Sequence, residues 1–266
     1  MFSRGHLANL VAVSLCVYIV SNIGHEIGGH ASACVAVGAK LKTISANYIE
    51  CNADGVTPFA HGLEKAAGST VNLVLFLLAQ LSLRIGAQSG SLSRYSVWLM
   101  SSVNSLQAAG YLLFSGLMNV GDWAGIAEYA GQPIAVRAAL TVIGAGLYLA
   151  FIRLSLRQLQ EFVGLEGQRA RLSKVLCLLP YLAGGLSYVL ASLLSPIGVS
   201  VLFISAVAAS FGGTSALAWM YDLPEKYKFP LAATAMKSQP FSLPWVSAAT
   251  VLTVFFVVVL GRSISF

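Results

Sequence analysis

Apolar and polar positions along this chain alternate in long blocks rather than with a short period. An α-helix rises 1.5 Å per residue, so about 20 apolar residues cross the ~30 Å hydrocarbon core of a bilayer. Seven blocks approach or exceed that length, and the pattern therefore predicts about seven transmembrane helices. They cover residues 7–38, 66–85, 95–118, 134–156, 175–195, 197–221 and 245–261.

Two stretches of the chain carry more information than their hydropathy alone, one inside a block and one between blocks. The third block carries polar side chains in its interior, namely Ser101, Ser102, Asn104, Ser105 and Gln107. Lipid disfavours such groups, so this helix is expected to face protein or a water-filled cavity.

Between the first two blocks, residues 41–45 and 48–49 are strand-prone and Asp54-Gly55 is a turn signal. This segment is predicted to be a small sheet against the membrane, with a solvated linker as the alternative.

The composition agrees with a membrane protein. Hydrophobic residues make up 57% of the 266 residues and charged residues only 10%, with a mean hydropathy of +0.77. A soluble domain of this size is not so apolar. We therefore predict an all-α polytopic membrane protein in contact with the lipid bilayer, and the formal charge of +6 does not indicate a nucleic-acid partner.

The basic residues are distributed unevenly between the two sides that seven crossings would create. The side of the N-terminus carries eleven, which are Arg4, Arg84, Arg94, Arg153, Arg157, Arg169, Arg171, Lys174, Lys226, Lys228 and Lys237. The other side carries five, which are Lys40, Lys42, Lys65, Arg137 and Arg262. Since Lys and Arg collect on the cytoplasmic side, the N-terminus is predicted to be cytoplasmic. The ends of the first and third spans then lie on the extracytoplasmic or lumenal side.

The first apolar block contains three ionisable side chains in six residues, within the sequence Gly-His-Glu-Ile-Gly-Gly-His at 24–30. Such groups are costly in hydrocarbon unless they share a partner, and a metal ion is the simplest one. His25 and His30 are five residues apart, which a regular helix separates by roughly 140°. We expect Gly28-Gly29 to absorb the extra residue as a π-bulge that turns both imidazoles to one side. The alternatives are a polar cluster that ties helices together or a former metalloprotease.

A third ligand is expected at the end of the third span. Catalytic zinc usually has three protein ligands and one open position. Asp122 is the acidic residue at that end, so we predict a Zn²⁺ site of His25, His30 and Asp122, with Glu128 as the alternative third ligand. Glu26 would be the general base that takes a proton from water.

The remaining histidines and cysteines suggest no second site. His6 and His61 lie outside the interiors of the apolar blocks and are expected to be solvated or interfacial. The four cysteines, at positions 16, 34, 51 and 177, contain no Cys-x-x-Cys pair. They predict neither a disulfide framework nor a zinc knuckle.

These motifs resemble those of the site-2 proteases, a family of intramembrane zinc metalloproteases. The likeness covers about residues 8–125: His-Glu-Ile-Gly-Gly-His in the first span, Gly68-Ser-Thr-Val-Asn72 opening the second, and Asn-Val-Gly-Asp122 closing the third. Such a member would be divergent, since the family has His-Glu-x-x-His and a Pro where Ser69 stands. The longer His-Glu-x-x-x-His spacing is similar to that of the dipeptidyl peptidase III zinc enzymes.

The resemblance implies a three-helix metalloprotease core in residues 1–130 and a C-terminal membrane region of about four spans in 131–266. It implies hydrolysis of a peptide bond in or near a membrane-embedded helix of a substrate protein, with Asn72 holding the unwound substrate or the oxyanion. An interhelical hydrogen bond is the alternative for Asn72. The strand-prone segment could pair with an unwound substrate by β-addition. The alternative functions are a metal or proton transporter and a protease-derived scaffold without activity.

Overall fold

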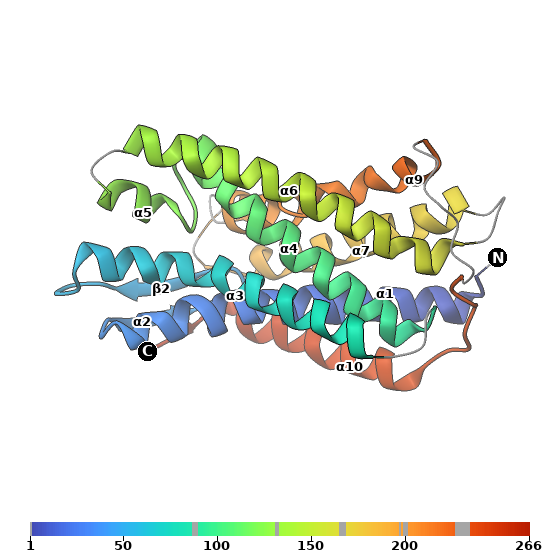
Figure 1. Ribbon diagram of the computed structural model, residues 1–266. Helices are drawn as coiled ribbons and strands as arrows, with labels where there is room; N and C mark the ends of the chain where they lie inside the picture. Colours follow the sequence, from blue (N-terminus) through green and yellow to red (C-terminus); the bar gives the residue numbers. More distant parts are fainter. Residues whose placement is uncertain are drawn as a thin grey trace.

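The computed structural model describes residues 2–86, 90–130, 133–164, 169–196, 198, 202–226 and 235–266. Long helices run side by side, and the two chain ends lie at opposite ends of the bundle (Figure 1). The longer helices are α1 (Arg4–Ile23), α3 (Pro58–Ile85), α4 (Leu92–Met118), α6 (Pro133–Val163), α7 (Arg169–Leu193) and α10 (Leu243–Val254). Shorter ones are α2 (Ser32–Ala36), α5 (Ala124–Tyr129) and α9 (Leu223–Lys226).

Five helical stretches in the described residues are long and apolar enough to cross a membrane. They are Arg4–Ala36, Pro58–Ile85, Pro133–Val163, Arg169–Leu193 and Leu243–Arg262. The prediction of a mainly helical membrane protein is thus confirmed, whereas the predicted number of seven spans is not. The second helix begins earlier than predicted because Thr57 caps it and Pro58 fits its first turn.

The third predicted span forms the helix α4, although it is not among these five. Its polar side chains are buried, with at most 3% of Ser101, Ser102, Asn104, Ser105 and Gln107 exposed. The helix packs against α1, α3 and α6. The expectation that this face meets protein rather than lipid is therefore confirmed.

The sixth predicted span is not one continuous α-helix in the part of the chain that the structure describes. It contains the π-helix η2 (Leu202–Gly212) and the short 3₁₀ helices η3 (Ser215–Ala218) and η4 (Met220–Asp222). The hydroxyls of Ser210 and Thr214 donate to backbone carbonyls one turn earlier, and a glycine pair follows at 212–213. Both features weaken a regular helix. The beginning of this span, at 197 and 199–201, lies outside the described residues, as does Lys228.

The strand-prone segment after the first span forms a sheet, as predicted. Strands β1 (Lys40–Ile44) and β2 (Ile49–Asn52) pair antiparallel. The C-terminal strand β3 (Ile264–Ser265) pairs with the other edge of β1, so the strand order is β2-β1-β3. This last strand has no strong sequence signal because it is only two residues long. The outer edge of β2 has no partner strand among the described residues.

A disulfide joins Cys34 of α2 to Cys51 of β2. The sequence predicts no disulfide framework, and it does not anticipate this single bond between two of the four cysteines. The turn after α2, where Gly38 has a φ of +80°, returns the chain along the helix and brings together two cysteines that are 17 residues apart. Cys16 and Cys177 are buried free thiols.

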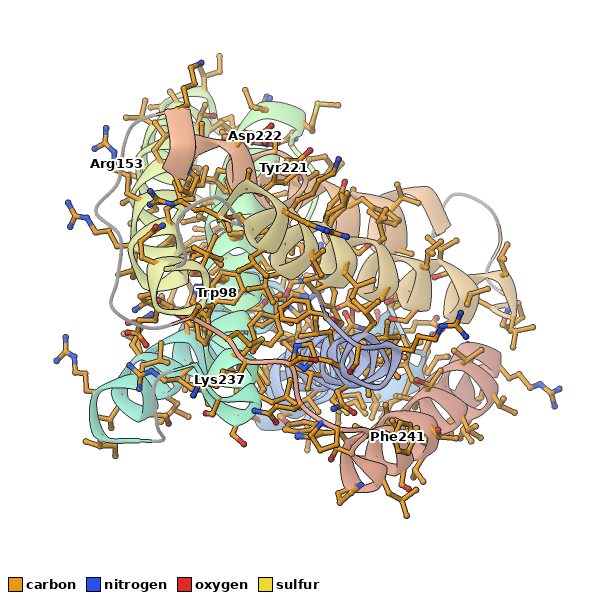
Figure 2. The ribbon with its side chains drawn as sticks, turned by 90° about the vertical axis from the view of Figure 1, so that its right-hand side faces the viewer. Trp98, Arg153, Tyr221, Asp222, Lys237 and Phe241 are labelled. Carbon is orange, nitrogen blue, oxygen red and sulfur yellow. A yellow bond between two sulfur atoms is a disulfide. The ribbon has the colours of Figure 1, made fainter. Side chains whose placement is uncertain are left out.

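The segment before α10 packs against the start of α1 at the end of the bundle shown in Figure 2, where Lys237 and Phe241 are labelled. His6 is fully buried there and accepts a hydrogen bond from the backbone N–H of Gln239. The expectation that His6 is solvated or interfacial is therefore wrong, because this returning segment covers it. One hydrophobic core includes residues of both halves of the chain, and the division at residue 130 stays a prediction.

Candidate metal centre

The two histidines lie on a helical segment with a wide turn. Residues Gly24–Ala31 form the π-helix η1 within the first long helix. A π-helix bonds residue i to i+5, so side chains five residues apart come to the same side. His25 and His30 meet there with their Nε2 atoms 3.2 Å apart. The predicted local widening is confirmed, and it extends over eight residues rather than one bulge.

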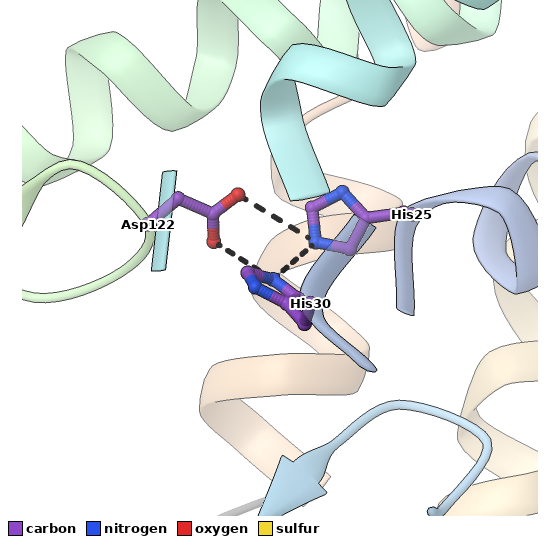
Figure 3. Close-up of side chains that lie close together, drawn as sticks. All are labelled: His25, His30 and Asp122. Atoms are coloured by element: carbon purple, nitrogen blue, oxygen red, sulfur yellow. Dashed lines mark hydrogen bonds and ion pairs between the residues drawn. The ribbon is translucent and has the colours of Figure 1, made fainter. Parts of the chain in front are cut away.

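Asp122 joins the two imidazoles from the loop after α4, as Figure 3 shows. Its Oδ2 lies 3.6 Å from Nε2 of His25 and its Oδ1 lies 3.7 Å from Nε2 of His30. One ligand atom from each of the three side chains lies within 4.8 Å of the others. Tetrahedral zinc with bonds of about 2.0–2.2 Å holds its ligand atoms roughly 3.4 Å apart. The spacing of these three side chains therefore fits such an ion.

The tautomer of His30 follows from its other ring nitrogen. Nδ1 lies 3.1 Å from the backbone carbonyl oxygen of Glu64. A carbonyl can only accept, so Nδ1 carries a hydrogen, and in the neutral imidazole Nε2 is then the nitrogen with the lone pair. The imidazole is thus held in the form that binds a metal through Nε2.

The tautomer of His25 is set by a chain of side-chain amides from α3 and α4. Asn104 donates from Nδ2 to the carbonyl of Met100, so its Oδ1 is the acceptor for Nδ2 of Asn72, at 2.8 Å. The Oδ1 of Asn72 therefore faces Nδ1 of His25, at 2.6 Å, and must accept its hydrogen. In the neutral imidazole of His25, Nε2 is likewise the nitrogen with the lone pair, so both neutral histidines offer Nε2 to a metal.

Asn72 thus contacts the candidate ligand His25 through Nδ1, the ring nitrogen that would not bind the metal. Its side chain is fully buried, and its Nδ2 also approaches Oε1 of Gln107 at 3.3 Å. The interhelical hydrogen bond that the sequence left open is present between α3 and α4. A contact of Asn72 with substrate or an oxyanion stays a prediction, and it would require the amide to leave one of these partners.

Two glycines allow η1 and α3 to approach closely enough for this geometry. A Cβ at Gly68 would lie 2.4 Å from Nε2 of His30 and 2.7 Å from Nε2 of His25. A Cβ at Gly29 would lie 2.6 Å from the Cα of Gly68. Any larger residue at Gly68 would fill the space between the imidazoles, which gives a physical reason for glycine in this motif.

The loop that carries Asp122 turns sharply after α4. Asn119 is left-handed with a φ of 56°, and Gly121 has a φ of +94°. The backbone N–H of Ser69 donates to Oδ2 of Asp122 at 2.8 Å. Burial raises the pKa of this carboxyl, but the two imidazoles and the Ser69 N–H hold the pKa below its ordinary value. The carboxylate is therefore anionic, as a metal ligand must be.

The alternative ligand Glu128 is not in this cluster, since it lies exposed on α5. Glu26 follows the first histidine and is only 7% exposed. Its carboxylate has no hydrogen bond or ion pair with any residue that the structure describes, and it borders the same cavity as the histidines. The Glu26 carboxyl group thus borders the candidate metal centre without a protein partner of its own among the described residues.

The cavity has a volume of about 880 Å³ and extends from the sheet to η2. The sheet end contributes Tyr48, Ile49 and Cys51, helix α4 contributes Gly110, Tyr111, Phe114 and Leu117, and η2 contributes Ser205, Ala208 and Ala209. His61 also borders the cavity and pairs with Glu64, with Nδ1 and Oε2 3.2 Å apart. His61 thus lies apart from the three-residue cluster.

Several residues around the centre were not assigned a role from the sequence. Asn104, Gln107 and Tyr111 are spaced by three and four, so they share one face of α4, and this spacing is a signal that could have been used. Glu64 contributes only its backbone carbonyl to His30, for which a sequence gives no signal.

Comparison with protein families, with characterised proteins and with solved structures finds no match. The likeness to the site-2 proteases therefore depends on the motifs and their spacing alone. Since a fold does not fix a function, the activity has to be argued from the chemistry of this centre.

Proposed function

We propose that the protein is an intramembrane zinc metalloprotease of the site-2 protease type, which hydrolyses a peptide bond in or near a membrane-embedded helix of a substrate protein. One observation carries the proposal. Nε2 atoms of His25 and His30, which carry the lone pairs when the imidazoles are neutral, lie with the carboxylate of Asp122 at the spacing of zinc ligands. The free carboxylate of Glu26 adjoins the first ligand in sequence and shares its cavity.

The chemistry follows from these groups. A zinc ion, when bound, would act as a Lewis acid and lower the pKa of water toward ~7. Glu26 takes a proton from the attacking water while the water oxygen forms a bond to the carbonyl carbon of the substrate. The π electrons of the carbonyl group move to the carbonyl oxygen. When the C–N bond breaks, Glu26 returns the proton to the leaving nitrogen. Water and the peptide bond are consumed, and one carboxylic acid group and one amine are formed.

The substrate would have to reach this centre as an extended strand, because a helix keeps its carbonyls in hydrogen bonds. The outer edge of β2 faces no other described strand, while β3 covers the opposite edge of β1. Ile49 and Cys51 of β2 border the cavity. We therefore propose that an unwound substrate adds to the outer edge of β2 and is led from there to the metal centre.

Two independent features support an extracytoplasmic or lumenal position for the centre. The Cys34–Cys51 disulfide lies beside the cavity, and disulfides persist in oxidising compartments. The opposite end of the bundle, which Figure 2 faces, holds the N-terminus (Figure 1) and basic residues such as Arg153 and Lys237. Basic residues favour the cytoplasmic side.

The proposal is tested by elemental analysis and by proteolysis of a transmembrane-helix peptide in proteoliposomes. The purified protein should hold about one zinc per chain, and His25→Ala should lose it. Glu26→Gln should keep the zinc and abolish cleavage, because the amide cannot accept the proton.

The same variants separate the alternatives. A metal or proton transporter that uses this cluster would lose transport with Glu26→Gln and would show no cleavage in the wild-type protein. A protease-derived scaffold would show no cleavage and would keep its cellular function in both variants. No zinc in the wild-type protein would overturn the proposal.

A further inference from the structure

The ring of Tyr111 lies flat against the first histidine of the metal centre. The two ring centroids are 4.8 Å apart and the ring planes differ by 17°. Tyr111 comes from α4, one turn after Gln107, and it borders the cavity. A cavity-lining phenol is therefore fixed directly beside a candidate metal ligand.

The hydroxyl of Tyr111 is not used by the fold. The hydroxyls of the other helix-borne tyrosines in the bundle interior have protein partners: Tyr18, Tyr95, Tyr148, Tyr181 and Tyr188. That of Tyr111 has no hydrogen-bond partner among the described residues. Since the ring stacks on His25 and borders the cavity, this free donor belongs to the part of the molecule where the reaction would occur.

Peptide hydrolysis needs a donor for the carbonyl oxygen as it becomes negative. Hydrogen bonds aimed at this oxyanion are often the largest single contribution to catalysis. Asn72 has both ends of its amide occupied by His25 and by the two amides of α4. The metal centre therefore lacks a free amide donor at that position.

We propose that Tyr111 is a catalytic residue whose hydroxyl donates a hydrogen bond to the oxyanion of the substrate carbonyl. This inference rests on the proposed function. The phenol keeps its proton throughout: it donates a hydrogen bond as the carbonyl π electrons move to oxygen, and the bond weakens when the carbonyl reforms. Glu26 alone transfers the proton between water and the leaving nitrogen.

The test removes only the phenolic oxygen. Tyr111→Phe keeps the aromatic ring and its stacking on His25, so Co²⁺ binding, followed by its visible absorption, should change by less than about twofold. Acetohydroxamate, a small anion that binds metal through its oxygens, serves as the probe of the oxyanion position. Its dissociation constant for the Co²⁺ protein should rise about tenfold or more in Tyr111→Phe, because a hydrogen bond to a charged group is lost.

Two further variants make the outcome decisive. Tyr129→Phe makes the same chemical change on the exposed α5 and should leave both affinities unchanged. Tyr111→Leu also removes the stacked ring and should weaken Co²⁺ binding as well. Equal acetohydroxamate affinity in Tyr111→Phe and wild type would overturn the role of Tyr111. Absence of Co²⁺ binding in the wild-type protein would instead overturn the proposed function.

Discussion

At the scale of single residues, Gly68 is the position of the candidate metal centre that leaves least space for a side chain. Gly68 faces both imidazoles, and an added Cβ would lie 2.4 Å from Nε2 of His30. The neighbouring backbone is equally tight, because Gly29 approaches the Cα of Gly68. Both distances are shorter than a real Cβ atom shows, so the imidazoles or the η1 backbone would have to shift to admit one methyl group.

Gly68→Ala is therefore expected to lower zinc affinity by a factor of about ten or more. Substitutions that disturb the orientation of metal ligands have effects of this size. Gly146→Ala in α6 is the matched control, because its Cβ would meet no atom within 4 Å. This control should gain roughly 0.5–1 kcal/mol from helix propensity and keep wild-type zinc affinity. A competitive zinc chelator titration and thermal unfolding measure both quantities. Normal zinc affinity in Gly68→Ala would contradict the close approach described here.

The proximity of the three candidate ligands could be predicted at this scale, whereas the residues that support them could not. His25, His30 and Asp122 stand out because ionisable groups are rare in apolar helices. The amide chain from Asn104 through Asn72 to His25 depends on how α3 and α4 pack, and the same is true of the stacking of Tyr111. No local pattern encodes which polar side chains of two helices meet.

At the scale of elements, the long apolar helices could be predicted from the length of the apolar blocks. The places where a regular helix is interrupted were harder to predict. The π-helical turn η1 followed from a histidine spacing that a regular helix cannot satisfy. The break after η2 lies where the hydroxyls of Ser210 and Thr214 bond to the backbone, and the two-residue strand β3 depends on its pairing with β1. The disulfide was missed because a turn between α2 and β1 decides the distance between its cysteines.

This disulfide ties the sheet to the helix that carries the histidines. Closing a loop of this length contributes about 3 kcal/mol of stability through the unfolded chain. Cys34→Ser with Cys51→Ser should therefore lower the unfolding temperature, and reductant should lower that of the wild-type protein to a similar value. The variant Cys16→Ala with Cys177→Ala should retain the sensitivity to reductant, because those thiols are free. A wild-type unfolding temperature unaffected by reductant would contradict the bond.

At the scale of the whole molecule, one core joins both halves of the chain around the metal centre. Tyr188 of α7 donates to the backbone carbonyl of Tyr18 in α1, and Gln107 of α4 approaches the same hydroxyl at 3.4 Å. Asn47, in the turn between β1 and β2, donates to the carbonyl of Tyr188 and to Ser192. The helix α7 thus holds the sheet and the histidine helix in one fixed arrangement, although the resemblance to known proteases ends before it.

The two ends of this bundle should differ in their access to a membrane-impermeant reagent. Tyr129 on α5 is exposed at the end that carries the metal centre, and Lys237 is exposed at the basic end. In sealed vesicles of known sidedness, a charged maleimide should label Tyr129→Cys from the extracytoplasmic or lumenal face. Lys237→Cys should react only from the cytoplasmic face or after detergent is added. The buried native thiols provide the background, because Cys16 and Cys177 should react from neither face. The reverse pattern would place the disulfide in a reducing compartment, and it would then contradict both the charge argument and the orientation proposed for the protein.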